Sequence, residues 1–190
     1  LKNGLRLNLT GEIISRPYIN LTLQLMKEFG ADAAWSSESS ITVRPGQYKD
    51  IPFTVESDWS GASYWYQMVA LSQDSKEEAA KTEVELLGLF PRSYQGDSRG
   101  TEIFTKLGVQ TTYTDRGVVL TKIGTPVARL KEDLVDIPDL AQTFVVTCCL
   151  MNIPFRFSGL QSLKIKETDR IQALITELHK LGYVVKSEQD

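Results

Sequence analysis

The chain has 190 residues, of which 42% are hydrophobic, so it can bury a sizeable core within one domain or parts of two. The chain contains 21 Lys and Arg and 24 Asp and Glu, which gives a net charge of −3. The charged residues are scattered, so the chain has no basic stripe of the kind that binds nucleic acids or anionic membranes. No apolar run approaches the roughly 20 residues of a membrane span, and the first residues lack the order of a signal peptide. We therefore expect a soluble, cytoplasmic, globular protein with neither nucleic acid nor membrane as a partner.

The first predicted element is a helix that begins near Ser15-Arg16-Pro17-Tyr18 and ends at Gly30. Serine followed shortly by proline is a common helix start, but the hydroxyls and the guanidinium of this segment could equally meet an anionic ligand. At the other end, residues 25–31 read as an amphipathic helix closed by a glycine, which adopts the left-handed backbone at low cost before a strand begins.

A second helix is predicted over residues 60–71. The small residues at its start, within the segment 58–65, indicate either a helix cap or a close approach of the backbone to another group. Another amphipathic helix ends at Gly108. Two strands follow, over residues 110–113 and 118–122, and an Asp-Arg-Gly sequence joins them as a hairpin turn.

The next predicted helix covers residues 139–151 and is strongly apolar after its first residue, Asp139. An aspartate at a helix start is ordinarily a cap that satisfies unpaired backbone N–H groups. A carboxylate in that place could equally act as a base near a substrate hydroxyl. From the residues alone, both interpretations stay open.

Two cysteines and one histidine are the only residues of their types in the chain. Cys148 and Cys149 are adjacent within the apolar helix, where they can form neither an unstrained disulfide nor a metal-binding spacing, so we expect reduced core residues. His179 lies in a polar stretch of the last predicted helix. With no second histidine to share a metal ion, it is expected to face solvent rather than to bind zinc.

The strongest local signal is Lys166-Glu167-Thr168-Asp169-Arg170, which follows a short apolar run and is predicted to open the last helix. If the segment is helical, Lys166 and Arg170 lie on one side, beside the unpaired N–H groups of the first turn, an arrangement that suits a phosphate or a carboxylate. The alternative is a solvated helix start in which Thr168 or Asp169 is the cap.

The helix-ending glycines Gly30, Gly108 and Gly182 recur at nearly equal intervals, which indicates an internal repeat. The unit reads βαβαββ. We interpret the chain as an incomplete first copy, a full middle copy and a third copy that stops before its hairpin closes, so it looks truncated at both ends. The alternation predicts an α/β (α+β) fold, in which helices cover sheets.

The segment from Lys166 to Arg170 resembles the KE[ST]DR signature of the EPSP synthases, a highly specific motif. The resemblance implies two domains, each built as an inside-out α/β barrel of three βαβαββ units. Residues 1–55 would form the end of the second enolpyruvate transferase domain, and residues 56–190 would form an incomplete part of the first. Other segments agree in order along essentially the whole chain: Ser15-Arg16-Pro17-Tyr18 with S-[KR]-P-Y, residues 58–64 with GD-x-SSASY, Gln95-Gly96-Asp97 with QGD, and Ile137-Pro138-Asp139 with IPD.

The resemblance also implies an activity. EPSP synthases transfer the enolpyruvyl group of phosphoenolpyruvate to the 5-hydroxyl of shikimate 3-phosphate and release phosphate, in the pathway to chorismate and the aromatic amino acids. Such chemistry needs a base, an acid and cations that hold two anionic substrates. We expect these two small molecules as partners and neither a cofactor nor a metal ion. The full-length protein would be a monomer, whereas the chain alone would be inactive and prone to self-association through unpaired strand edges.

Individual residues take roles by the same resemblance. Asp139 would be the base toward the 5-hydroxyl and a ligand of the shikimate, and Glu167 would move the proton at the methylene carbon. Lys166 would contact both substrates, and Arg170 would hold phosphoenolpyruvate. The other substrate-binding residues would be Ser15 and Tyr18, on the shikimate 3-phosphate side, and Ser162, which stands where the family often has asparagine.

The sequence departs from the family at several positions. Ser57 and Gly61 replace a glycine and a serine of the GD-x-SSASY segment. No counterpart is found for the family's N-terminal lysine and arginine, its central S-S-Q loop, or its C-terminal arginine and lysine. A noncatalytic module with the same fold is one alternative, which the joint retention of the acidic and basic site residues disfavours. A UDP-N-acetylglucosamine enolpyruvyl transferase is another, but that enzyme normally uses a reactive loop cysteine, unlike the apolar pair Cys148 and Cys149.

Overall fold

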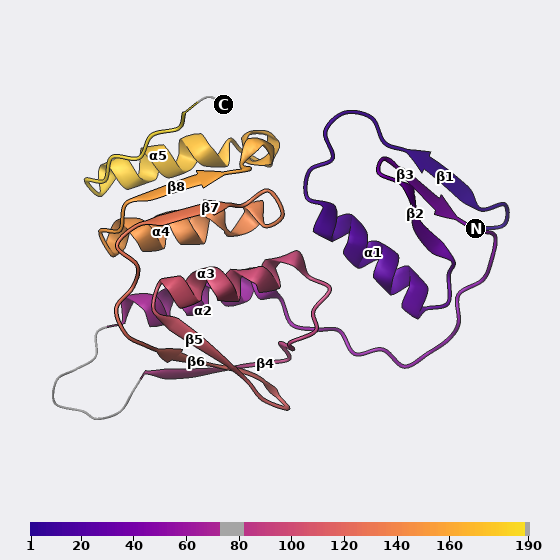
Figure 1. Ribbon diagram of the computed structural model, residues 1–190, viewed down its shortest axis with the longest axis horizontal. Helices are drawn as coiled ribbons and strands as arrows, with labels where there is room; N and C mark the ends of the chain where they lie inside the picture. Colours follow the sequence, from indigo (N-terminus) through magenta and orange to yellow (C-terminus); the bar gives the residue numbers. More distant parts are fainter. Residues whose placement is uncertain (73–81, 189–190) are drawn as a thin grey trace. The chain divides into compact units, whose positions relative to one another are not determined.

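A computed structural model describes residues 1–72 and 82–188 of the chain (Figure 1). The chain divides into two compact units. The first comprises Leu1–Val55 with Tyr94–Gly96, and the second comprises Glu56–Ser93 with Asp97–Asp190. No helix formed by the described residues is long and apolar enough to cross a membrane.

The first unit is a small three-stranded sheet with one helix. Strand β1 (Leu5–Asn8) and strand β2 (Ala33–Ser37) both pair antiparallel with β3 (Ser40–Val43), in the order β1-β3-β2. Helix α1 (Arg16–Glu28) buries Leu23 in a small apolar cluster with residues of β2 and β3.

The second unit contains two sheets and four α-helices among its described residues (Figure 1). One sheet is antiparallel in the order β4-β6-β5, and the other is the parallel pair β7-β8, whose crossover contains α4. Short 3-10 helices precede α3, α4 and α5. The elements are α2 (Trp59–Leu71), β4 (Glu83–Leu87), η1 (Gly96–Arg99), α3 (Gly100–Lys106), β5 (Val109–Tyr113), β6 (Gly117–Lys122), β7 (Leu130–Asp133), η2 (Pro138–Leu140), α4 (Ala141–Leu150), β8 (Phe155–Ser158), η3 (Gln161–Ile165) and α5 (Arg170–Lys180).

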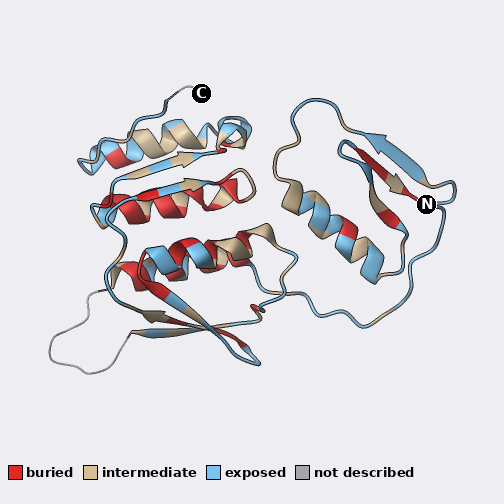
Figure 2. Ribbon diagram, in the orientation of Figure 1, coloured by how far each residue is buried: buried red, intermediate tan, exposed pale blue. Residues whose placement is uncertain are grey.

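The core of the second unit is built on α2, α3 and α4, whose buried residues appear red in Figure 2. Aromatic rings run through it: Phe144 lies 4.9 Å from Phe104 and 6.3 Å from Phe157, measured between ring centroids. Helices α2 and α4 contact each other through polar side chains as well, because Ser63 and Thr143 share a 2.9 Å hydrogen bond between their hydroxyls. These contacts fix the start of α4, which carries the candidate site.

Several predicted elements are confirmed. Gly30, Gly108 and Gly182 have φ angles of 87°, 89° and 88°, so each helix does end in the left-handed conformation that favours glycine. The predicted hairpin is the antiparallel pair β5-β6. Both cysteines are buried and free, and His179 is exposed on α5.

The middle copy of the repeat was predicted to begin with a strand before the helix at residues 60–71, and this strand is missing. Residues 44–58 form no strand, so the copy reads α2-β4-α3-β5-β6. Pro45 and Pro52 interrupt this stretch and cannot donate backbone hydrogen bonds to a ladder. Near the end of this stretch, Ser57 N donates a backbone hydrogen bond at 2.8 Å to the carbonyl oxygen of Gly88, the residue after β4.

Candidate active site

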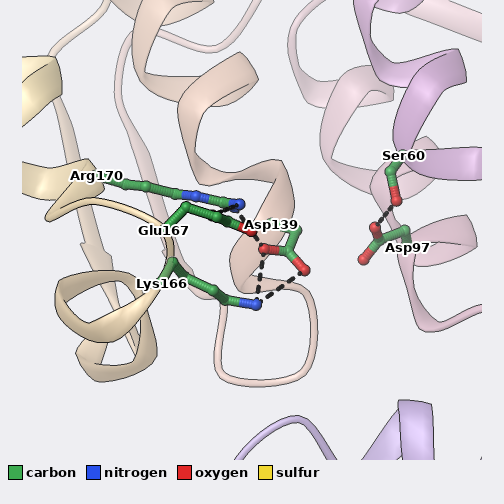
Figure 3. A network of polar contacts seen from close by, with 6 residues as sticks. All are labelled: Ser60, Asp97, Asp139, Lys166, Glu167 and Arg170. Atoms are coloured by element: carbon green, nitrogen blue, oxygen red, sulfur yellow. Dashed lines mark hydrogen bonds and ion pairs between the residues drawn. The ribbon is translucent and has the colours of Figure 1, made fainter.

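The polar cluster of the second unit is centred on Asp139, which lies in the 3-10 helix just before α4 (Figure 3). Its carboxylate accepts a hydrogen bond from Arg170 Nη1 at 2.8 Å. Lys166 Nζ lies 3.2 Å from Oδ1 and 3.5 Å from Oδ2 of the same carboxylate. The positions of Asp139 and Lys166 at helix starts in successive parts of the repeat predict that Asp139 lies within roughly 10 Å of Lys166 or Glu167, and this prediction is confirmed.

Glu167 completes the cluster through its ion pair with Arg170, in which Nη2 donates to Oε2 at 2.7 Å. The side chains differ in exposure: those of Asp139 and Arg170 are 22% and 24% exposed, whereas that of Glu167 is 77% exposed. Two cations therefore face two carboxylates. The Asp139 carboxylate is half-buried and pairs with both cations, whereas the Glu167 carboxylate is exposed to solvent.

The predicted placement of Lys166 and Arg170 on one side of a helix is wrong. Helix α5 begins at Arg170, and Lys166 has an extended backbone before it. The physical reason is Asp169, whose side chain accepts a hydrogen bond from Gln172 N at 3.0 Å and so starts the helix at Arg170, four residues after Lys166. The alternative that Asp169 is the cap is confirmed. The two cations converge because the extended segment brings Lys166 to Asp139.

Asp139 does not occupy the cap position that was considered for it. The N-cap residue of the 3-10 helix is Ile137, and the N-cap residue of α4 is Leu140; neither makes a side-chain cap hydrogen bond. By contrast, Asp58 is the N-cap of α2 and accepts from Ser60 N at 2.8 Å, so the capping interpretation of that segment is confirmed.

The other predicted site residues lie outside this cluster. Ser15 and Tyr18 belong to the first unit, where Ser15 precedes α1 with a left-handed φ of 56° and makes no side-chain cap. Tyr18 is exposed. Ser162 lies in η3 of the second unit, and its hydroxyl is buried without a hydrogen-bond partner among the described residues. A buried hydroxyl without a partner is uncommon and marks a place where a ligand group could bond.

Ser60 and Asp97 received no predicted role, although both lie in segments that resemble motifs of the family, residues 58–64 and 95–97. Ser60 Oγ donates to Oδ2 of Asp97, which is only 3% exposed (Figure 3). The pair joins the first turn of α2 to the 3-10 helix before α3. Sequence order alone gives no signal for it, because 37 positions separate the two residues.

The surroundings of Glu167 favour the charged form of its carboxyl group. Its own backbone N–H and the Arg170 guanidinium both stabilise the carboxylate and hold the pKa of Glu167 below its usual value. The same ion pair raises the pKa of Arg170. Burial raises the pKa of Cys148 to about 12, so this thiol is a poor nucleophile near neutral pH. Among the described residues, no group of three or more His, Cys, Asp or Glu could hold a metal ion.

Replacing Arg170 by methionine is expected to raise the pKa of Glu167, because the variant removes both the hydrogen bond and the positive charge that stabilise the carboxylate. Carbon-13 NMR titration of the Glu167 carboxyl group measures this shift. Lys166→Met is the matched control and should raise that pKa less, because Lys166 acts on Glu167 only through its charge and is the weakest of the stabilising causes. A larger shift in the control would contradict the assignment.

The fold and the cluster together define a mixed α/β protein with a charge-balanced cluster of two cations and two carboxylates just before α4 and at the start of α5. The sequence matches the family described as EPSP synthase (3-phosphoshikimate 1-carboxyvinyltransferase) over residues 1–190. The chain belongs to this family.

Curated relatives agree with the match. A Bacteroides fragilis protein named 3-phosphoshikimate 1-carboxyvinyltransferase is 66% identical over 190 residues, which is 100% of this chain and 45% of that protein. Proteins of the same name from Idiomarina loihiensis and Methanospirillum hungatei are 34% and 31% identical, over 97% and 99% of this chain and 41% and 43% of their own lengths. The chain thus spans less than half of the relatives that it matches.

Proposed function

We propose that the complete protein carrying this chain transfers the enolpyruvyl group of phosphoenolpyruvate to the 5-hydroxyl of shikimate 3-phosphate. The observation that carries the proposal is the Asp139 carboxylate held between Lys166 and Arg170, at 3.2 and 2.8 Å. The relatives are named 3-phosphoshikimate 1-carboxyvinyltransferase, and an enolpyruvyl group is a 1-carboxyvinyl group. The two domains of the proposed enzyme would be inside-out barrels, with residues 1–55 in the second and residues 56–190 in the first.

In the proposed addition step, Asp139 takes the proton of the 5-hydroxyl while the oxygen attacks C2 of phosphoenolpyruvate. The methylene carbon C3 gains a proton in the same step, which gives a tetrahedral intermediate. In the elimination step, that carbon gives a proton back to Glu167, the bond between C2 and the phosphate oxygen breaks, and the phosphate leaves with the proton that Asp139 had taken. Arg170 and Lys166 supply positive charge beside the anionic groups throughout.

Glu167 is the proposed proton carrier at C3, and its environment sets a condition on that role. A proton donor near neutral pH needs a raised pKa, whereas the ion pair with Arg170 lowers the pKa of Glu167 in the free protein. When phosphoenolpyruvate replaces Glu167 as a partner of Arg170, Glu167 loses this stabilisation and gains a nearby anion, and both changes raise its pKa. Substrate binding thus prepares Glu167 to hold the proton.

Ser15, Tyr18 and Ser162 are proposed substrate ligands, with Ser15 toward the phosphate of shikimate 3-phosphate. Their present state is compatible with this role: the Ser15 hydroxyl makes no cap, and the buried Ser162 hydroxyl has no protein partner among the described residues. Hydroxyl groups in such positions can donate to phosphate or to a ring hydroxyl of the substrate.

The test is phosphate release by the complete gene product, with both substrates, each substrate alone, and UDP-N-acetylglucosamine in place of shikimate 3-phosphate. The proposal predicts release only when phosphoenolpyruvate and shikimate 3-phosphate are both present. Release with the nucleotide sugar would favour the sister transferase, and no release with any pair would favour the noncatalytic module. The raised pKa of the Cys148 thiol already disfavours a reactive-cysteine mechanism.

The 190-residue chain on its own is expected to be inactive and to associate with itself, whereas the complete protein is proposed to be a monomer. Helix α2 contains no charged residue, yet Tyr64, Trp65 and Met68 are 56%, 48% and 59% exposed. A cavity of about 920 Å³ opens beside α4, β8 and α5. Uncovered apolar surface of this kind drives association. Sedimentation velocity should show species heavier than 21.3 kDa at micromolar concentration; a single 21.3 kDa species at every concentration would contradict this.

A further inference from the structure

Gln142 lies in the first turn of α4, three residues after Asp139, and joins the two halves of the charged cluster. Its amide nitrogen donates to the backbone carbonyl oxygen of Asp139 at 2.9 Å, and its amide oxygen accepts from Arg170 Nη1 at 3.2 Å. This orientation of the amide is the one that gives both atoms a partner. A glutamine near a helix start is ordinarily a surface residue, whereas this side chain is half-buried and bonded at both ends.

Arg170 has three acceptors in the cluster, and they differ in charge. Asp139 Oδ1 and Glu167 Oε2 are carboxylate oxygens at 2.8 and 2.7 Å, and each neutralises part of the guanidinium charge. Gln142 offers a neutral oxygen. A neutral acceptor holds the guanidinium plane in place and leaves its positive charge for a substrate.

This difference matters when an anion binds. A phosphate or carboxylate that approaches Arg170 competes with Asp139 and Glu167 for its N–H groups, because all three acceptors are anionic. The amide oxygen of Gln142 is neutral, so its hydrogen bond from Arg170 neutralises none of the guanidinium charge. Because the amide is also tied to the Asp139 backbone, the guanidinium stays directed toward the start of α4.

We propose that Gln142 is a positioning residue for the reaction proposed above: it holds the Arg170 guanidinium ready for the anionic enolpyruvyl donor without lowering its charge. This inference rests on the proposed function. The side chain must donate to a carbonyl oxygen and accept from a guanidinium at the same time, and the glutamine amide does both without charge. Asparagine is one methylene shorter, and glutamate would place a third carboxylate beside Arg170.

The test uses Gln142→Met and Gln142→Glu in the complete gene product. Methionine keeps most of the volume and removes both bonds, so KM for phosphoenolpyruvate should rise about tenfold, as expected for the loss of a hydrogen bond to a charged group, while kcat changes by less than about threefold. KM for shikimate 3-phosphate should not change. Glutamate should raise KM for phosphoenolpyruvate further than methionine does, because it repels the donor anion.

Gln172→Met is the matched control, because Gln172 lies two residues after Arg170 on α5 but its amide bonds Thr176 instead of the cluster. It should leave all three kinetic constants unchanged. The proposal is overturned if Gln142→Met leaves KM for phosphoenolpyruvate unchanged, whether or not kcat falls.

A second measurement separates this inference from the proposed function. If the wild-type gene product releases no phosphate, the proposed function fails, and the contact is then tested by urea unfolding of Gln142→Met, Arg170→Met and the double variant. Non-additive losses of unfolding free energy would support the contact between Gln142 and Arg170. Additive losses would overturn it, whatever the protein catalyses.

Discussion

Replacing Asp139 by asparagine is expected to lower kcat for enolpyruvyl transfer about a thousandfold, within the range of a lost general base. Asparagine has nearly the same shape and can still accept hydrogen bonds from Lys166 and Arg170, which lie 3.2 and 2.8 Å away in the wild type. It cannot take a proton from the 5-hydroxyl of the substrate. Phosphate release at saturating concentrations of both substrates measures the effect.

Asp136→Asn is the control for this variant, because it removes a carboxylate three residues earlier that is not part of the charged cluster. Its kcat should stay within about twofold of the wild-type value. If Asp139→Asn retained more than about a tenth of the wild-type kcat, Asp139 would not be the general base and the proposed addition step would be wrong.

Replacing Phe144 by alanine is expected to lower the free energy of unfolding by about 3–5 kcal/mol, the usual cost of deleting a buried phenylalanine. Phe144 is completely buried in α4 and packs between Phe104 and Phe157, so neighbouring rings cannot easily fill the space. The loss extends to the site, because the same helix carries Gln142 and follows Asp139 directly. Urea unfolding of the complete gene product measures the change.

Phe144→Leu separates the cavity from other effects of changing this residue. Leucine keeps most of the apolar volume, so the loss should fall to about 1–1.5 kcal/mol. Equal losses for leucine and alanine would mean that ring packing does not determine the stability of this core. A loss below about 1 kcal/mol for alanine would mean that the packing of Phe144 contributes little to the stability of this core.

The local features of the fold could be predicted from the sequence because each depends on a few adjacent residues. The left-handed backbone at Gly30, Gly108 and Gly182 requires only a glycine after an amphipathic helix, and all three have this conformation. The Asp-Arg-Gly turn likewise predicts the β5-β6 hairpin. The internal repeat was inferred from the nearly equal spacing of these three glycines.

The pairing of strands that are distant in the sequence could not be predicted from the residues alone. Residues 44–58 contain β-forming residues but no strand, because a strand needs a partner and the prolines in this stretch remove donors. The start of α5 depended on a competition between neighbours: the four-residue spacing of Lys166 and Arg170 suggested a helix, whereas the Asp169 cap begins it at Arg170.

The site was partly predictable for a related reason. Asp139 and Lys166 were expected near each other because both precede helices in successive parts of the repeat, and their charged groups lie 3.2 Å apart. Gln142 was not found, because an amide in a first helical turn carries no signal and its charged partner lies on α5. Only the folded arrangement shows that it bonds Arg170.

The central claim is that Asp139, Lys166, Glu167 and Arg170 form one substrate site. A crystal structure of the complete gene product with shikimate 3-phosphate and phosphoenolpyruvate bound tests it most directly. The account predicts that Arg170 and Lys166 nitrogens lie within about 3.2 Å of phosphoenolpyruvate oxygens, and that an Asp139 oxygen lies within about 3.2 Å of the 5-hydroxyl. Both substrates bound elsewhere, with Asp139 still paired to Lys166 and Arg170, would contradict it.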